Sequence, residues 1–480
     1  MKEFTDRALN LAQVQGATYA DIRVVQRVGQ SLVVKNGIVE AIEMSESQGF
    51  GVRVIANGAW GFASSSTLSA TEIDRVTALA VQIARASALT RETPVKLDKA
   101  RKIAATYHTP VTVDPFSISL DKKIEHLLLA DASMRRVKGI RVAESSMECL
   151  RIEKTFASSE GSHIQQTIIE TGGGIECTAV NENDVQKRSY PNSFGRHQGT
   201  AGYEMITSMD MPGNGEKIAE EAVALLSARQ CPPGVTTIIL GATQLALQVH
   251  ESCGHPIEID RVFGTEASYA GTSFLTTEKL GHFRYGSDAV NITADATIAG
   301  GLGTFGYDDE GVPAQSRPIV RGGMFVGYLT DREYAATLGQ ESGGAARADG
   351  WSRIPIVRMT NINLEPGTWT FDDLVADTHD GIYMELNKSW SIDDKRLNFQ
   401  FGTEIAYEIK KGKMGAMLKN ATYTGITPQF WAGCDAICNK DFWNVWGTPN
   451  CGKGQPPQTA HVGHGAAPAR FRNVRVGLMK

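Results

Sequence analysis

The chain has 480 residues, of which 42% are hydrophobic and 21% charged, a composition typical of a globular protein with two or three domains. Its net charge of −5 offers no electrostatic attraction to nucleic acid or to an anionic membrane, and no apolar run approaches the ~20 residues that a membrane helix needs. The first residues lack the apolar core of a signal peptide, and seven scattered cysteines do not form a disulfide framework, so we expect a cytoplasmic protein.

The first half of the chain alternates predicted helices with short predicted strands. Asn36-Gly37 and Asn57-Gly58 lie between β-rich segments and predict tight hairpin turns. Ser69 is a predicted N-cap. Amphipathic patterns predict helices over residues 3–15, 69–89, 119–136 and 215–229.

Pro232-Pro233-Gly234 marks a boundary at which the predicted secondary structure changes from mixed helix and strand to mostly strand. Beyond it, one helix is predicted after the strand TTIIL, near Thr243, and the remainder reads as short strands between glycine, asparagine and aspartate turns. We therefore predict an α+β fold. A mixed α/β domain over residues 1–230, with subdomains 1–110 and 111–230 as an alternative, precedes a mostly antiparallel, barrel-like domain over 235–480.

The segment QVHESCGHPIE, residues 248–258, places His250 and His255 five positions apart. On a regular helix five steps leave two side chains roughly 140° apart, too far for one metal ion. A single π-type turn with i→i+5 bonding would bring them together. Alternatively the helix unwinds at Gly254, and Pro256 disfavours the α region for His255.

This pattern has two interpretations. Neutral imidazoles are good zinc ligands, and Glu251, next to the first of them, could take a proton from a water on the metal. A catalytic zinc site usually has three protein ligands, however, and the segment supplies two. A His-Glu pair is more often on the surface or in the core, so the residues alone leave both interpretations open.

H-E-x-x-x-H followed by x-x-E resembles the motif of the TldD/PmbA family, whose catalytic members are zinc metallopeptidases. GFGVRVIANGAWGFAS near the N-terminus, YDDEGVPAQSRPIVRGGMFVGYLTDREYA and SRIPIVRMTNINLEPG in the second half, and NCGKGQ near the C-terminus are also similar to the family, in order along the chain. The resemblance implies that His250, His255 and Cys451 bind Zn²⁺ and that Glu251 is the general base.

Several residues near these keep more than one interpretation. Glu258 also matches the family pattern, as a fourth ligand or as an acceptor that orients a ligand histidine, with a surface carboxylate as the alternative. Cys253 is predicted to pack. His461 and His464 are candidates to contact substrate or the ligands, although a surface loop is expected there. Residues 383–402 replace an expected glycine-rich stretch with a charged loop that bears a tryptophan, which affects the expected substrate preference.

The leading hypothesis is a zinc peptidase that acts on peptides or unfolded segments inside an enclosed cavity. The resemblance also implies a dimer, either a homodimer or a heterodimer with a TldE/PmbA-type paralogue. The alternatives are a catalytically silent peptide-binding partner, which should lack His250, Glu251 or His255, and a zinc hydrolase of non-peptide amides.

Overall fold

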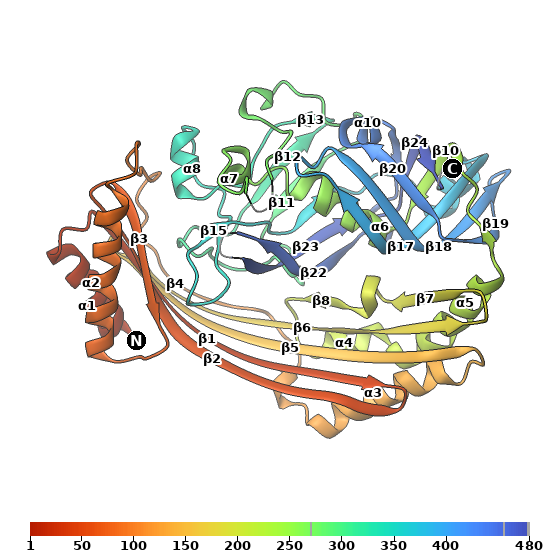
Figure 1. The fold of residues 1–480 in the computed structure, drawn as a ribbon, viewed down its shortest axis with the longest axis horizontal. Helices are drawn as coiled ribbons and strands as arrows, with labels where there is room; N and C mark the ends of the chain where they lie inside the picture. The colour runs from red at the N-terminus through yellow and green to blue at the C-terminus, as the bar shows by residue number, and fades with distance from the viewer. Residues whose placement is uncertain (269–270, 455–456, 478–480) are drawn as a thin grey trace.

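A long, curved eight-stranded sheet dominates the first half of the chain (Figure 1). The structure is a computed structural model and describes residues 1–268, 271–454 and 457–477. The strand order is β3-β2-β1-β5-β6-β4, and β7 and β8 also pair with β6. The strands are β1 (Tyr19–Lys35), β2 (Ile38–Ala56), β3 (Ala59–Ser65), β4 (Ala104–His108), β5 (Ile140–Ser158), β6 (His163–Val180), β7 (Val185–Tyr190) and β8 (His197–Gly199).

The two predicted hairpin turns are confirmed, but the strands that they join are longer than predicted. Asn36 and Asn57 adopt left-handed φ angles of 50° and 52°, as tight hairpin turns require. β1 and β2 extend over 17 and 19 residues, where the sequence indicated separate short strands. The reason is that the burial of each strand changes along its length: β1 is continuously buried at its start and partly exposed further on. In the sequence, such a change in the hydrophobic pattern resembles the end of one strand and the start of another.

Helices cover this sheet near both of its ends. The predicted helices are confirmed, and Ser69 caps the second through a 3.2 Å bond from Glu72 N–H to its hydroxyl oxygen. One helix pair packs on β1 and β2, and the other packs on β5 and β6. The helices are α1 (Lys2–Val14), α2 (Ala70–Ser87), α3 (Leu120–Arg135), α4 (Glu204–Met209) and α5 (Met211–Ser227), with 3₁₀ turns η1 (Pro115–Ser117) and η2 (Ser193–Gly195).

A closed five-stranded barrel forms the core of the second half. Its ring of pairings is β17-β10-β24-β20-β18 and back to β17, and only the β10–β17 pair is parallel. The predicted α+β fold with a barrel-like second half is therefore confirmed. The barrel strands are β10 (Gly234–Leu240), β17 (Asp380–Ile392), β18 (Asn398–Lys410), β20 (Thr422–Ile426) and β24 (Ala469–Val476), and β9 (Arg229–Gln230), β19 (Lys413–Lys419) and β21 (Cys434–Ile437) extend the sheet.

Smaller sheets and short helices surround the barrel. They comprise β11 (Ile292–Asp295), β12 (Ser316–Arg321), β13 (Met324–Phe325) and β16 (Ile362–Leu364) in one sheet, the pairs β14 (Ala346–Arg347) with β15 (Ile356–Val357) and β22 (Asn444–Lys453) with β23 (Gln458–Ala466), and the helices α6 (Ala242–Val249), α7 (Ile259–Val262), α8 (Arg332–Thr337), α9 (Phe371–Ala376) and α10 (Thr427–Ala432), with η3 (His250–Gly254), η4 (Thr277–Lys279) and η5 (Lys440–Phe442). The sequence predicted one helix here. The others were missed because segments of four to six residues are too short to show a helical period.

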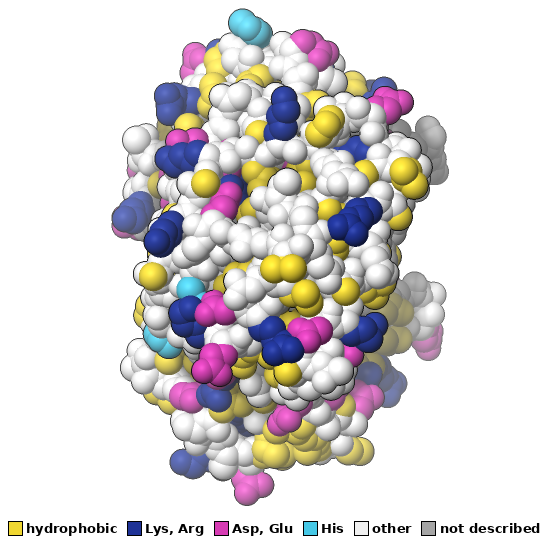
Figure 2. Space-filling model, turned by 90° about the vertical axis from the view of Figure 1, so that its left-hand side faces the viewer, with side chains coloured by type: hydrophobic (Ala, Val, Ile, Leu, Met, Phe, Trp, Pro, Cys, Tyr) yellow, Lys and Arg dark blue, Asp and Glu magenta, His cyan; other side chains and the backbone are white. Residues whose placement is uncertain are grey.

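The β22–β23 pair lies between the barrel and the long sheet, and α6 packs against β23 and β17 (Figure 1). Positive and negative side chains are interspersed on the face shown in Figure 2, so that face has no large patch of one sign. Among the described residues, no helix is both long and apolar enough to span a membrane.

Candidate metal centre

The helix that carries the histidine motif is irregular where a five-residue spacing requires it. After α6, residues His250–Gly254 form a π turn, and the His255 N–H donates to the His250 carbonyl oxygen at 3.1 Å. The two imidazole centroids lie 4.8 Å apart with the rings nearly perpendicular. The predicted π-type turn is confirmed, and it places both rings on one side.

The causes of this turn differ from those that the sequence suggested. His255 keeps α-helical angles, φ −65° and ψ −43°, although Pro256 follows it. Gly254 does not adopt a left-handed φ. A Cβ at Gly254 would lie 2.2 Å from Met359 Sδ, so the glycine permits close approach of a neighbouring chain segment rather than unusual backbone angles.

Cys451 on β22 meets the two histidines. Its Sγ lies 3.7 Å from His255 Nε2, and the nearest donor atoms of His250, His255 and Cys451 all lie within 4.8 Å of one another. All three side chains are buried. Tetrahedral bonds of about 2.0–2.3 Å to one zinc hold their donors about 3.3–3.8 Å apart, so the 3.7 Å contact fits one ion and the widest spacing would have to close by about 1 Å on binding.

Hydrogen bonds fix the tautomer of His250. His464 Nδ1 lies 3.2 Å from the Ile362 carbonyl oxygen, which can only accept, so this nitrogen carries the proton. His464 Nε2 is then an acceptor, 2.7 Å from His250 Nδ1. His250 Nδ1 therefore donates, and His250 Nε2 keeps a free lone pair, as a metal ligand must.

Glu258 fixes His255 in the same way. Its Oε2 lies 2.9 Å from His255 Nδ1, which leaves His255 Nε2 free to face Cys451. Glu258 is fully buried and lies 3.5 Å from the Lys453 ammonium and 3.8 Å from the Arg358 guanidinium. The alternative of a surface carboxylate is wrong, because these buried cations hold the group inside, where it orients a candidate ligand.

The pKa shifts favour the protonation states that bind metal. Burial lowers the pKa of His250 and lowers that of His255 far below its ordinary value, so both imidazoles are neutral. Burial alone would raise the pKa of Cys451, but neighbouring groups, among them the Arg358 guanidinium, outweigh it and lower that pKa. Arg358 Nη2 donates to Cys451 Sγ at 3.2 Å. Neutral imidazoles and a thiolate-favouring cysteine fit a zinc ion.

Glu251 lies within the π turn beside the candidate ligands. Its Oε2 accepts a 2.5 Å hydrogen bond from Arg396 Nη1, from the loop between β17 and β18. Both side chains line a cavity of about 310 Å³. The cavity is also lined by Phe194 and Arg196 from the first half of the chain and by Trp390 of β17. Both halves therefore shape the space in front of His250.

Cys253 points elsewhere, as predicted. It is fully buried in the hydrophobic core of the second half, and burial raises its pKa to about 12. A thiol with that pKa stays protonated and packs as an apolar group.

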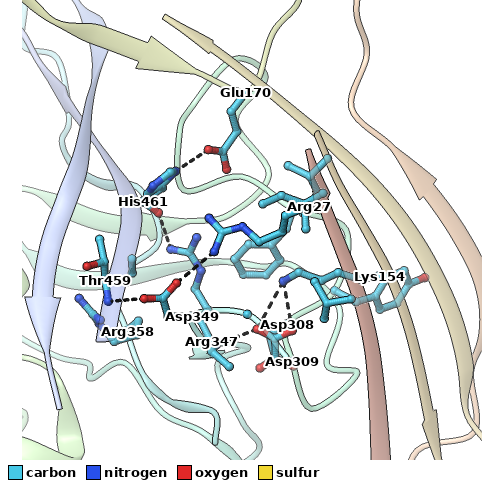
Figure 3. Close-up of a pocket in the computed structure, with 18 of the residues that line it drawn as sticks. Arg27, Lys154, Glu170, Asp308, Asp309, Arg347, Asp349, Arg358, Thr459 and His461 are labelled. Carbon is cyan, nitrogen blue, oxygen red and sulfur yellow. Dashed lines mark hydrogen bonds and ion pairs between the residues drawn. The ribbon is translucent and has the colours of Figure 1, made fainter. Parts of the chain in front are cut away.

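His461 and His464 both lie on β23, so the expected surface loop is wrong for both. His464 is fully buried behind His250. His461 faces the long sheet, where its Nδ1 lies 2.5 Å from Glu170 Oε2 (Figure 3). The glycines and prolines near the two histidines favour a loop in the sequence, whereas the histidines lie in β23, which pairs with β22.

The sequence reasoning missed Arg358, Arg396 and the Phe194–Arg196 segment. Arg396 belongs to the stretch 383–402, whose unexpected composition could have indicated it. The predicted loop over that whole stretch is wrong, because β17 and β18 take up all of it except residues 393–397. Arg358 lies in the segment SRIPIVRMTNINLEPG that resembles the family, but a single arginine in a strand-rich region did not distinguish itself as part of the site.

The fold and the site together define a class: an α+β protein whose barrel-containing half holds a buried cluster of two histidines and a cysteine beside a glutamate. Residues 233–477 match the PmbA/TldA metallopeptidase C-terminal domain, residues 20–84 match domain 1 and residues 113–229 match the central domain. The chain belongs to the PmbA/TldD family of metallopeptidases.

Similar proteins agree with this assignment. A protein of Methanocaldococcus jannaschii named Metalloprotease MJ0996 is 30% identical over 96% of this chain and 98% of its own length. A Haemophilus influenzae protein named Metalloprotease TldD homolog is 26% identical over 98% and 96%. Both names describe metal-dependent proteases, so a metal ion is implied.

Solved structures share the fold over the full length. A crystal structure of a Thermotoga maritima protein superposes with a TM-score of 0.78 at 17% identity, covering 99% of this chain and 100% of that one. TldE from Thermococcus kodakarensis gives a TM-score of 0.75 at 15% identity, covering 98% and 99%. At these identities the similarity concerns the fold alone.

Proposed function

We propose that the protein is a zinc-dependent peptidase whose ion is held by His250, His255 and Cys451. The observation that carries this proposal is the convergence of three buried donors, with the lone pairs of both imidazoles directed by hydrogen bonds, on the turn that also bears Glu251. A silent partner subunit would have no need for this set.

Each residue has a distinct part in the reaction. When bound, zinc supplies a Lewis acid for the scissile carbonyl and lowers the pKa of a water towards neutrality. Glu251 accepts the proton of the attacking water and passes it to the departing amine, as a general base that becomes a general acid. Arg396 holds the Glu251 carboxylate in place during these transfers. Glu258 and His464 keep the two imidazoles in the tautomer that leaves Nε2 free.

The substrates are peptides or unfolded segments. The cavity of about 310 Å³ takes a few residues, and α6, β22 and a segment of the first half all contribute to its wall. A folded domain cannot present a scissile bond to side chains buried as deeply as these.

Metal analysis tests the proposal most directly. Purified protein should contain close to one zinc per chain and should hydrolyse short peptides, whereas Cys451→Ala should lose most of the zinc and the activity. Cys253→Ala is a matched control, because it removes a buried thiol of the same motif that faces the core. Equal zinc in the wild type and in Cys451→Ala would remove the cysteine from the site. Cleavage of simple amides but not of peptides would show a non-peptide hydrolase.

The active form is a dimer, either of two copies or with a TldE/PmbA-type paralogue. The shared fold of TldE supports a pairing between similar chains. The outer edge of β2 also supports a dimer. Its pairing with β3 begins only at Phe50, and no other described strand covers the edge before that residue. Ile38, Ile42 and Met44 are exposed on this uncovered part of β2. Such an edge can add a strand from another chain. Sedimentation of the protein alone and mixed with a paralogue distinguishes the two forms, and a monomer in both would exclude the dimer.

A further inference from the structure

The cavity in front of the candidate metal centre has an excess of positive charge. Of the described residues that line it, Arg196 and Arg396 are cationic and Glu251 is the one carboxylate. No described carboxylate lies within ion-pair distance of Arg196, which is solvent-exposed. One positive charge in the cavity is therefore not neutralised by the protein.

Arg396 itself has unused hydrogen-bonding capacity. Its guanidinium offers five N–H donors, and Nη1 is bonded to Glu251. Its Nε is buried and has no hydrogen-bond partner in the described part of the chain. A buried N–H without an acceptor is costly, which points to an acceptor that arrives with a ligand.

The backbone around Arg396 is held firmly. Arg396 adopts a left-handed φ of 63° in a turn closed by its N–H to the Asp393 carbonyl oxygen at 2.8 Å. The Asp393 carboxylate accepts from the N–H of Leu397 at 2.7 Å, and the Thr427 hydroxyl donates to the Arg396 carbonyl oxygen at 2.9 Å. A fixed backbone and a guanidinium held at one end by Glu251 leave the Nε side in a defined position, which favours selective binding.

We propose that Arg396 is a specificity-determining residue that binds a carboxylate of the substrate through its free N–H groups while Nη1 holds Glu251. This inference rests on the proposed peptidase function and names its substrate class: peptides that carry a carboxylate next to the scissile bond. Guanidinium groups bind carboxylates through two parallel N–H···O bonds, which gives both affinity and orientation.

The carboxylate must lie close to the reacting amide. Arg396 is in direct contact with Glu251, the proposed proton carrier, and an extended chain advances about 3.3–3.6 Å per residue. The carboxylate therefore belongs to the residue at the scissile bond or to its immediate neighbour. It is either the free C-terminus of the peptide or an acidic side chain.

Two aromatic rings define a second feature of the same substrate. Phe194 from the first half and Trp390 of β17 meet edge to face with centroids 6.0 Å apart, and both remain partly exposed in the cavity. Exposed rings beside a charged pocket favour an apolar side chain on the substrate. We expect an apolar residue next to the carboxylate-bearing position.

Matched peptides test the inference. One apolar sequence is prepared with a free C-terminus, with a C-terminal amide, and as amides with glutamate or with glutamine at the terminal position. Zinc-loaded protein should cleave one carboxylate form at least about tenfold more efficiently, in kcat/KM, than its neutral counterpart, because charged hydrogen bonds of this kind are worth that much. The free acid against the amide reports on a C-terminal carboxylate, and glutamate against glutamine reports on a side chain.

Variants assign the preference to Arg396. Arg396→Gln should bring the ratio of carboxylate to neutral substrate towards one, Arg396→Lys should retain part of it, and Arg75→Gln, an exposed arginine on α2, should leave it unchanged. A second measurement needs no turnover: calorimetric titration of chelator-treated protein should show tighter binding of the carboxylate peptide, and Arg396→Gln should abolish the difference.

Failure of this inference can be distinguished from failure of the peptidase function. If the zinc-loaded wild type cleaves carboxylate and neutral peptides equally and binds them equally, Arg396 does not select substrates although the peptidase stands. If no peptide is cleaved but the carboxylate form still binds more tightly and loses that advantage in Arg396→Gln, the peptidase proposal fails and the carboxylate site remains. An Arg396→Gln variant that folds and keeps the full preference would overturn the inference.

Discussion

Gly254 and Met359 are in such close contact that an added methyl group would overlap the sulfur atom, with Cβ only 2.2 Å from Met359 Sδ. This contact lies at the end of the π turn whose i→i+5 bond joins His255 to His250. The segment that carries Met359 thus packs directly against the turn that brings the two candidate ligands together.

Replacing Gly254 with valine should therefore weaken zinc binding without removing a donor. The branched side chain must displace Met359 or the turn, at a cost of about 1–3 kcal/mol in unfolding free energy. Zinc affinity, measured by competition with a chelator, should fall. The double variant Gly254→Val with Met359→Ala should recover part of the loss, whereas Gly234→Ala, where a Cβ meets nothing within 4 Å, should change nothing. Unchanged zinc affinity in Gly254→Val would mean that the turn does not set the ligand spacing.

Much of the site could be predicted because its chemistry lies in short segments of sequence. The five-residue spacing of His250 and His255 required an irregular helix by geometry alone, either a π turn or unwinding at Gly254, and the π turn is the one present. The reason for a glycine at position 254 could not be predicted. It is the contact with Met359, more than 100 positions away, which a single sequence does not reveal.

Prediction of the fold likewise succeeded where the features are local and failed where they depend on tertiary contacts. Hairpin turns and amphipathic helices are local, so Asn36-Gly37 and α2 could be placed. The joining of predicted short strands into β1 and β2 depends on which part of the chain covers each face, and this is a tertiary property. The role of Arg396 likewise depends on a contact across 145 positions. The division of the chain near residue 230 stays a prediction.

Glu251→Gln should separate catalysis from metal binding. The amide keeps the size of the side chain and can still accept from Arg396, but it cannot take up a proton. We expect normal zinc content and a fall in kcat of about 10²–10⁴-fold, the range for loss of a general base. Metal analysis and peptide hydrolysis on the same preparation provide the comparison. A variant that keeps most of its activity would mean that another group moves the proton.

His464→Ala should lower zinc affinity although His464 is not a proposed ligand. Without its Nε2 acceptor, His250 Nδ1 loses the partner that fixes its tautomer, and changes of this kind typically cost about 10–100-fold in metal affinity. Chelator competition measures the affinity. The control is His126→Ala, a partly buried histidine on α3 far from the site in the chain. Equal affinity in wild type and His464→Ala would show that the tautomer of His250 needs no support.

The contact of His461 with Glu170 should make stability depend on pH. Burial alone would lower the pKa of His461, but the Glu170 carboxylate outweighs it and the net pKa is raised; burial alone would raise the pKa of Glu170, but His461 outweighs it and the net pKa is lowered. Arg27 and Arg347 lie in the same pocket and also lower the pKa of Glu170 (Figure 3).

The sign of the dependence follows from these directions. A raised histidine pKa stabilises the folded state fully below the unfolded value of about 6.5, and the gain is lost as pH rises through the folded pKa. A lowered glutamate pKa stabilises it above about 4.3, and that gain is lost as pH falls through the folded pKa. The pair therefore contributes most between about pH 4.3 and 6.5. The difference in unfolding free energy between wild type and His461→Gln, from urea titrations, should be larger near about pH 6 than near about pH 9. His108→Gln, an exposed histidine on β4, should show no such trend. If the His461→Gln difference stayed constant from about pH 6 to about pH 9, the ion pair between β23 and the long sheet would not form in solution.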